Sequence, residues 1–452
     1  MTALVVRARR TWTGSFEPAQ VRVVDGVVVA VDAYDAPAAP DDEIVTLADD
    51  EVLLPGLVDS HVHVNEPGRT HWEGFASATR AAAVAGVTTI VDMPLNSVPP
   101  TTTPDALTAK LAATQGKLSV DVAFWGGAVP DNLGALGPLH AAGVRGFKAF
   151  LAPSGVDEFG HLDADQLRAA LAEVAALGSV LIVHAEDPAH LHGSGALGSR
   201  YDDFVASRPP VSEREAIARV IDGVRETGAR AHILHVSAAD SLDLVRAARA
   251  EGLPLTVETC PHYLTLSADD VPAGATQYKC CPPIRDTANQ DLLWEAVLDG
   301  TVDAIVSDHS PATEDVKNVD DDFGLSWGGI AGLQLGFSAT WTAARARGLG
   351  LDAILPLFTT GPARVAGLSA GIIAPGAPAH LVAFAPDDEH VVDRHRLEHR
   401  NPVSPYHGAR LRGVARTVWL HGVPVVAGGV VARPGTGRTV LPEALRPGVA
   451  HV

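Results

Sequence analysis

Short apolar runs alternate with alanine-rich stretches of helical periodicity along the middle of the chain, between residues 56 and 311. The runs are hydrophobic on both faces, which is typical of strands in a parallel sheet that helices cover on each side. Asp163, Ser212 and Asp240 each precede good helix formers and are predicted N-caps. The predicted strands are 56–64, 86–94, 120–128, 144–151, 180–187, 231–237, 255–263 and 302–311. The helices predicted between them include 76–85, 163–177, 212–227, 239–251 and 289–299.

Eight strand–helix units of this kind predict an α/β fold, a closed (β/α)8 TIM barrel. An open, doubly wound sheet is the alternative. That fold would place a glycine-rich phosphate loop after an early strand, and the sequence contains no such loop there. The barrel is therefore the preferred interpretation.

Shorter β-like runs lie outside this region, at both ends of the chain. Residues 3–7, 20–24 and 27–31 precede it, and Asp25-Gly26 is a hairpin signal. Helical stretches at 329–347 and 352–367 are followed by strands at 379–384, 413–420 and 423–426, with His421-Gly422 as a turn. We expect a small β-sandwich domain formed from both termini. The predicted division is 1–54 for its first part, 55–370 for the barrel catalytic domain, and 371–452 for its second part, with a loosely packed tail after Pro434.

Charge and composition narrow the class of protein. The formal net charge of the 452-residue chain is −20, which argues against nucleic acid and anionic membrane surfaces as partners. No apolar stretch is long enough to cross a bilayer, and no signal peptide is recognisable at the N-terminus. The three cysteines are few and irregularly spaced, which favours a reducing compartment. We expect a cytoplasmic protein.

Polar residues stand near the C-terminal ends of five of the predicted strands. In the first strand, His61 and His63 share one face at period two, about 6–7 Å apart. In a barrel, the C-terminal ends of all strands meet at one mouth. The six residues that this places together are His61, His63, Lys148, His184, His235 and Asp308.

Four imidazoles and a carboxylate suit zinc or a similar divalent ion, or two ions about 3.5–4 Å apart. Lysine cannot bind a cation as an ammonium, but a desolvated lysine loses its proton readily. The neutral amine of Lys148 could then add carbon dioxide and become a carboxylate-like bridge. Taken singly, each residue has an ordinary explanation: a salt-bridged Lys148, a hydrogen-bonded core His184, a helix-capping Asp308. Their joint placement at strand ends favours a metal site.

With these residues in place, the chain resembles the cyclic amidohydrolases of the amidohydrolase superfamily, which include dihydroorotases, hydantoinases and allantoinases. The resemblance covers essentially the whole chain. It implies two metal ions, usually zinc, bridged by a carbamylated lysine. By motif position it assigns all six residues above as ligands, with Lys148 as the modified one. It also implies that Asp308 acts as the catalytic acid–base, and that the enzyme is a homo-oligomer, a tetramer.

Five stretches resemble the allantoinase group in particular. They are HVNEPGRT (63–70), DMPLNSVPPTT (92–102), CCPPIRD (280–286), SDHSP (307–311) and WGGIAGLQ (327–334). One departure is His380, where the family commonly has aspartate after the alanine, at a position expected in the β domain and away from the site. The resemblance further implies substrate contacts at Asn65, Asn96, Ser310, and the main chain around Cys281 and Gly329.

Two absences separate the chain from its other relatives. Dihydroorotases usually carry an arginine where this chain has Asn65. Hydantoinases usually carry a tyrosine soon after the bridging lysine, and this chain has no tyrosine shortly after Lys148. The resemblance thus implies hydrolysis of the hydantoin-ring amide of allantoin to allantoate, in purine degradation. A hydantoinase (dihydropyrimidinase) is the alternative, and a metal-free, non-enzymatic relative is a further one.

Overall fold

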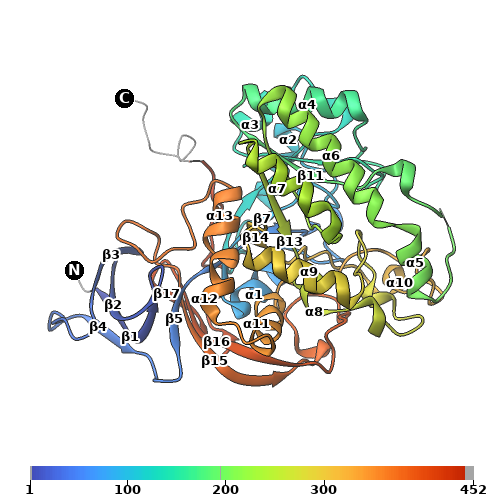
Figure 1. Cartoon of the computed structure of the whole chain (residues 1–452). Coiled ribbons are helices and arrows are strands. Elements are labelled where there is room, and N and C mark those ends of the chain that lie inside the picture. The colour runs from blue at the N-terminus through green and yellow to red at the C-terminus, as the bar shows by residue number, and fades with distance from the viewer. Residues whose placement is uncertain (1–2, 194, 443–452) are drawn as a thin grey trace.

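The computed structural model describes residues 3–193 and 195–442. It is an α/β structure in which parallel strands surrounded by helices stand beside a mostly antiparallel sheet (Figure 1). Both ends of the chain contribute to that sheet. The predicted α/β class and the sheet domain from both termini are therefore present.

The terminal sheet has nine strands in the order β18-β17-β16-β15-β5-β1-β2-β3, with β4 paired to β1. The two ends of the chain join where β15 runs antiparallel to β5. Asp25 and Gly26 form the predicted turn between β2 and β3, with φ of 50° and 80°. The strands are β1 (Leu4–Trp12), β2 (Phe16–Val24), β3 (Val27–Ala33), β4 (Glu43–Thr46), β5 (Val52–Pro55), β15 (Leu381–Val391), β16 (Arg410–Leu420), β17 (Val423–Ala427) and β18 (Val430–Val431).

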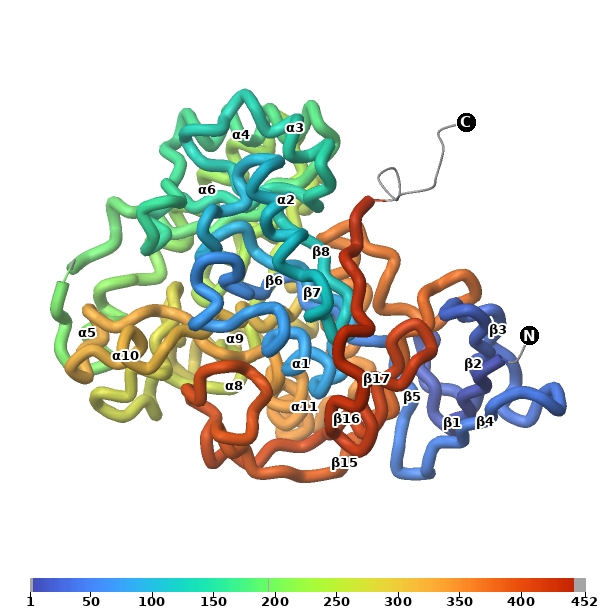
Figure 2. The backbone as a smooth tube through the Cα atoms, turned by 180° about the vertical axis from the view of Figure 1, so that it is seen from behind, coloured from blue at the N-terminus to red at the C-terminus, as the bar shows by residue number. Residues whose placement is uncertain are grey.

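The remaining strands form two parallel sheets, in the orders β6-β7-β8 and β14-β13-β12-β11-β10-β9. Figure 2 shows β6, β7 and β8 side by side. An isolated parallel bridge joins Val62 in β6 to His309, which follows β14. The strands are β6 (Leu57–Val62), β7 (Val87–Asp92), β8 (Asp121–Phe124), β9 (Gly126–Gly127), β10 (Phe147–Phe150), β11 (Val180–His184), β12 (Arg230–Ile233), β13 (Leu255–Thr259) and β14 (Ala304–Ile305). The parallel strands of the described residues thus lie in two sheets, and the single closed barrel stays a prediction.

The helices follow the predicted alternation with the strands. Asp163 caps α4 as expected, because its carboxylate accepts from the main-chain nitrogens of Asp165 and Gln166. Ser212 is not a cap, since Pro210 already begins α6, and Asp240 lies in a 3-10 turn before α7. The helices are α1 (Phe75–Ala85), α2 (Pro104–Ala113), α3 (Leu136–Ala141), α4 (Ala164–Ala176), α5 (Tyr201–Ser207), α6 (Pro210–Thr227), α7 (Leu242–Ala250), α8 (Pro261–Thr265), α9 (Thr287–Leu298), α10 (Glu314–Lys317), α11 (Gly336–Ala346), α12 (Leu351–Ile354) and α13 (Thr360–Val365).

The helix predicted over 329–347 is wrong in its first part, because α11 begins only at Gly336. The preceding loop is extended and bonded to the strand ends: Ser310 N donates to Ile330 O at 3.0 Å. Gly329 has φ of 146°, and a Cβ there would lie 2.4 Å from Ser310 O. Close packing against the strand ends therefore overrides the helical pattern. The short helix predicted over 352–367 is divided into α12, a 3-10 turn and α13.

None of the helices in residues 3–193 and 195–442 combines the length and hydropathy that a bilayer-spanning helix requires. The predicted boundary at residue 54/55 falls within the end of β5, and the one at 370/371 falls between α13 and β15. The end of the predicted tail, residues 443–452, lies outside the described residues.

Candidate active site

The six residues predicted at the strand ends line one cavity of about 480 Å³. His61 lies in β6 and His63 directly after it, while Lys148 lies in β10 and His184 ends β11. His235 and Asp308 follow β12 and β14, with φ of 34° and 42°. Such left-handed conformations are uncommon for residues other than glycine and are frequent at functional sites. Here they occur in two of the residues that face the cavity.

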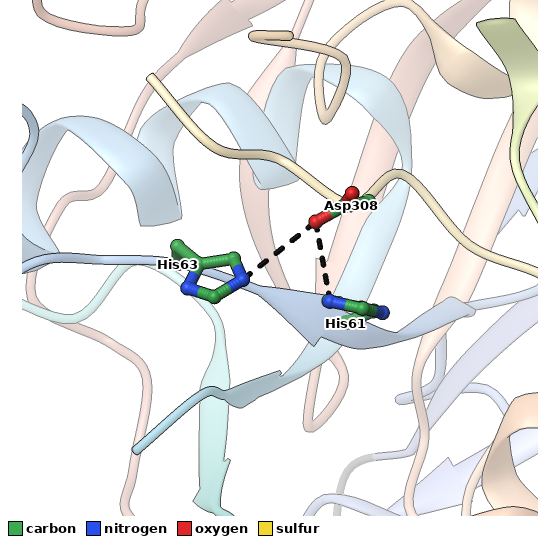
Figure 3. A group of neighbouring side chains, drawn as sticks. All are labelled: His61, His63 and Asp308. Atoms are coloured by element: carbon green, nitrogen blue, oxygen red, sulfur yellow. Dashed lines mark ion pairs between the residues drawn. The ribbon is translucent and has the colours of Figure 1, made fainter. Parts of the chain in front are cut away.

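Asp308 stands between His61 in β6 and His63, which follows that strand (Figure 3). Its Oδ1 lies 3.1 Å from His61 Nε2 and 3.6 Å from His63 Nε2. All three residues are buried, with exposed fractions of 0%, 6% and 7% for His61, His63 and Asp308. One ligand atom of each lies within 4.8 Å of the others, as a shared metal ion requires.

His184 and His235 form the second part of the site. His184 Nδ1 lies 3.0 Å from His235 Nε2, and the His61 and His235 ring centroids are 5.4 Å apart. Lys148 Nζ lies 4.5 Å from the centroid of the Phe150 ring, and that ring stacks on His184. No hydrogen bond or ion pair joins Lys148 Nζ to another residue within the described part of the chain. The ammonium or amine thus faces the cavity without a partner.

Two buried glutamates hold the outer nitrogens of these imidazoles. Glu258 in β13 contacts His61 Nδ1 at 2.6 Å, and Glu186 contacts His184 Nε2 at 2.8 Å. Carboxylates in this position fix the ring orientation and the tautomer of metal-binding histidines. Both were missed in the sequence, although Glu258 carries the same signal as the others, a charged residue within an apolar strand.

The electrostatics of the site favour neutral imidazoles at three of the four histidines, a protonated His61 and an ionised Asp308. Burial lowers the pKa of His63, His184 and His235. Burial alone would raise the pKa of Asp308, but His61 and its neighbours hold it well below the usual range. The carboxylates of Asp308 and Glu258 outweigh burial at His61 and raise its pKa to about 9.

Burial lowers the pKa of Lys148 to about 7, so a large fraction of the amine is neutral near neutral pH. The carboxylate of Asp308 opposes this shift without removing it. A neutral buried amine is the form that adds carbon dioxide.

The residues present fit a divalent metal centre. His61 Nε2, which faces Asp308, is buried and has no hydrogen-bond partner among residues 3–193 and 195–442. Unsatisfied buried nitrogens cost free energy, which a bound cation would offset. Imidazole and carboxylate donors together suit zinc among the common ions.

Four of the five predicted substrate contacts also line the cavity: Asn96, Ser310, Cys281 and Gly329. Asn65 does not. It is fully buried with φ of 65°, and its Nδ2 donates to Pro311 O at 3.2 Å. Its side chain therefore holds the segment next to Ser310.

Two cations that the sequence did not reveal, Arg208 and Lys279, line the cavity as well. Arg208 makes a short ion pair with Glu186, so a carboxylate compensates its charge. Because Arg208 lies in a loop between helices, no hydrophobic periodicity marks it.

A buried lysine supports the part of the cavity wall that the loop around Trp327 and Gly329 forms. Lys317 Nζ donates to the carbonyl oxygens of Lys279 at 2.7 Å and Trp327 at 3.0 Å, and to that of Gly329. These bonds fix the extended loop that replaces the start of the predicted helix.

Comparison with known proteins identifies the relatives of this chain. The model of the amidohydrolase family matches residues 52–427. An allantoinase of Streptomyces avermitilis is 52% identical over 434 residues, which cover 95% of this chain and 97% of that protein. The allantoinase of Saccharomyces cerevisiae is 43% identical, with 86% of each chain covered. The solved structure of L-hydantoinase (dihydropyrimidinase) from Arthrobacter aurescens has a TM-score of 0.91 at 30% identity, covering 98% of this chain and 100% of that one.

Proposed function

The chain belongs to the amidohydrolase family, and from this membership we propose that it is an allantoinase. It hydrolyses the hydantoin-ring amide of allantoin and gives allantoate, a step of purine degradation. The observation that carries this function is the identity of 38–52% with allantoinases across most of the chain. The six polar residues around one cavity supply chemistry of the required kind.

The proposed metal ligands are the six residues of the strand ends, which would hold two divalent ions, zinc by the chemistry of the donor set. When bound, the ions supply polarisation of the amide carbonyl and acidification of water. Glu258 and Glu186 orient His61 and His184 for this task.

Lys148 is proposed to carry the bridging carboxylate as a carbamate. Its neutral Nζ adds to the carbon of carbon dioxide and releases one proton, which converts a neutral amine into an anion. Support comes from the complete burial of Lys148 and from the pKa of about 7. An anion among four imidazoles also fits the site better than an ammonium would.

Asp308 is the proposed catalytic acid–base. Its carboxylate lies at the cavity surface, 3.1 Å from His61, and its low pKa keeps it ionised at neutral pH, the form that can accept a proton. It takes the proton of the attacking water and delivers it to the ring nitrogen that leaves.

Substrate contacts are proposed for Asn96, for Ser310, and for the main chain at Cys281 and Gly329, all on the cavity surface. Asn65 acts through Pro311, beside Ser310. Glu186 compensates the charge of Arg208, and the Lys279 ammonium donates to the carbonyl oxygens of Gly324 and Ser326. Because both cations already have partners, the cavity suits a neutral ring with amide donors and carbonyl acceptors better than a substrate carboxylate.

Other parts of the proposal concern the whole molecule. The parallel strands close into a (β/α)8 barrel, flanked by a β-sandwich from residues 1–54 and 371–452. The enzyme acts in the cytoplasm, consistent with the free thiols of Cys260, Cys280 and Cys281. It assembles as a homotetramer, as the family resemblance implies.

The test is a substrate panel of allantoin, dihydroorotate, hydantoin and dihydrouracil, with metal analysis of the purified enzyme. We expect the highest kcat/KM for allantoin and about two catalytic ions per chain. A hydantoinase is the second candidate, because the similar solved structures are hydantoinases. Turnover confined to simple hydantoins would favour it. Full activity without metal would overturn the metal centre, and neither metal nor activity would indicate a non-enzymatic relative.

A further inference from the structure

A second cluster of metal-binding side chains lies at the other end of the parallel strands. Asp121 is the first residue of β8, whereas the active site occupies the C-terminal ends. His380 directly precedes β15, and His421 lies in the turn between β16 and β17. The cluster therefore joins the parallel strands to the terminal sheet. His380, where this chain departs from the usual aspartate of the family, is one of the three residues of this cluster.

The three side chains point one atom each toward a common centre. Asp121 Oδ2 lies 3.0 Å from His421 Nε2 and 3.6 Å from His380 Nε2, and the two imidazole nitrogens are 3.5 Å apart. In a tetrahedral zinc site with bonds of about 2.0–2.1 Å, neighbouring ligand atoms are about 3.3–3.4 Å apart. The observed triangle thus matches one face of such a tetrahedron without rearrangement.

Hydrogen bonds within the cluster leave His380 poorly satisfied. His421 Nε2 carries at most one proton, and its shorter contact directs that proton to Asp121. The contacts of His380 Nε2, the nitrogen that faces the cluster, are longer, at 3.5 and 3.6 Å. His380 is nevertheless only 4% exposed. A buried imidazole normally has a partner, and a metal ion would supply one.

The charge of Asp121 and the backbone around the cluster also favour a bound cation. The Asp121 carboxylate is buried beside the two imidazoles, where a divalent cation would balance its charge. The main-chain nitrogen of Arg438 donates to Asp121 Oδ1 at 3.0 Å, while Oδ2 is the oxygen nearer to both histidines. The segment containing Arg438 runs beside β8 in Figure 2, and Val122 N donates to Arg438 O.

The histidine-bearing turns are held in place independently of any ion. His421 has φ of 49°, and the next residue, Gly422, donates from its nitrogen to Ala379 O at 2.8 Å. A Cβ on Gly422 would lie 2.9 Å from the Val23 side chain. The turn therefore keeps both histidines directed at Asp121.

We propose that Asp121, His380 and His421 bind a zinc ion that clamps the terminal sheet to the base of β8. Two imidazoles and one carboxylate form the ligand set, and a water completes the tetrahedron. The site is separate from the catalytic centre and independent of the reaction proposed above. Its role is to stabilise the contact between the two parts of the molecule.

The experiment measures zinc in purified variants after dialysis against zinc-free buffer. His421→Gln and His380→Gln should each contain about one ion fewer than the wild type. The same difference of about one ion should separate Lys148→Ala from the double variant Lys148→Ala/His421→Gln. That pair isolates the clamp from the catalytic metals. His395→Gln, a change of an exposed histidine, serves as the matched control and should keep the wild-type content.

Two further measurements test for the zinc ion even if one of these variants folds poorly. Zinc should raise the Tm of Lys148→Ala by about 5 °C or more, and leave that of Lys148→Ala/His421→Gln unchanged. In wild-type crystals, anomalous scattering at the zinc edge should give a peak within about 2.0–2.2 Å of all three ligand atoms. Equal zinc content in each pair of variants, or no peak at this position in zinc-soaked crystals, would overturn the proposal.

Discussion

Lys148 and Lys110 are equally buried, each with 1% of its surface exposed, yet their surroundings are opposite. Lys110 Nζ in α2 donates to Asp92 Oδ2 at 2.6 Å and to Met93 O at 2.9 Å. Lys148 Nζ faces the ring of Phe150 and four imidazoles. A buried charge with its counter-charge is part of the structure, whereas a buried cationic group with neither a counter-charge nor a hydrogen-bond acceptor indicates chemistry.

The histidines repeat the contrast within one short segment. His232 contacts Thr256 Oγ1 at 2.8 Å through Nδ1 and Glu258 Oε2 at 2.9 Å through Nε2. His235, three residues later, keeps a buried Nδ1 for which residues 3–193 and 195–442 offer no hydrogen-bond partner. Burial alone therefore does not distinguish the two, and hydrogen-bond satisfaction does.

The largest effect is expected for Lys148→Ala. The variant loses the proposed bridging ligand, so bound catalytic metal and activity should fall together, with kcat/KM lower by about 10⁴-fold or more. Metal analysis and steady-state kinetics with allantoin measure the two quantities. Retention of full activity would show that Lys148 is a structural residue like Lys110.

The same lysine predicts a pH dependence for reconstitution from metal-free enzyme with bicarbonate and zinc. Because its pKa is lowered to about 7, Nζ is mostly protonated below pH 7 and mostly neutral above it. Only the neutral amine adds carbon dioxide, so the rate of reactivation should rise as the pH increases through about 7. A reactivation rate that is independent of pH across this window would argue against the carbamate.

Asp308→Asn and Asp92→Asn extend the comparison to two buried carboxylates. Asp308→Asn should lower kcat by about 10²–10⁴-fold, the usual cost of a lost acid–base group. Asp92→Asn removes the partner of Lys110 and should reduce stability while the folded enzyme keeps its kcat within a few-fold. Thermal unfolding and kinetics on both variants separate the two roles. A kcat of Asp308→Asn near that of the wild type would place the proton transfer elsewhere.

Lys110→Met should affect stability where Lys148→Met does not. It leaves Asp92 buried without its counter-charge, which should lower the free energy of unfolding by about 3–5 kcal/mol. In metal-free protein, Lys148→Met removes an unpaired buried group and should leave that free energy unchanged or higher. Denaturant unfolding of both variants without metal provides the measurement. Equal destabilisation by the two changes would remove the distinction between these lysines.

Much of the site could be predicted because its residues interrupt apolar strands. His61, Lys148 and His184 stand out against hydrophobic neighbours, and a parallel arrangement brings strand ends together. Glu258 carried the same signal and was overlooked. Arg208 and Lys317 lie in loops or short helices without periodicity, so only the tertiary structure shows where they point.

The cluster of Asp121, His380 and His421 illustrates a different limit of sequence reasoning. About 260 residues separate its first member from its second, and no motif links them. These residues come together because β5 pairs with β15. The hydrophobic pattern predicts a domain formed from both ends of the chain, but it does not predict which strands pair. The helix prediction is wrong over 329–335 for a related reason, since the bonds of this loop to the strand ends replace helical hydrogen bonds.

The smallest effect is expected for Lys317→Met, a change of another buried lysine, and it should be one of substrate affinity. Lys317 donates to the carbonyls of Trp327 and Gly329, and Gly329 lines the cavity beside Ser310. Without these donors the wall relaxes, while the strand-end ligands are untouched. We expect KM for allantoin to rise about tenfold, equivalent to about 1.4 kcal/mol, with kcat within about threefold and full metal content. Glu314→Gln, an exposed change on the same helix, is the control. A loss of metal in Lys317→Met would show that the wall and the ligands are coupled, and an unchanged KM would show that the loop keeps its position without the lysine.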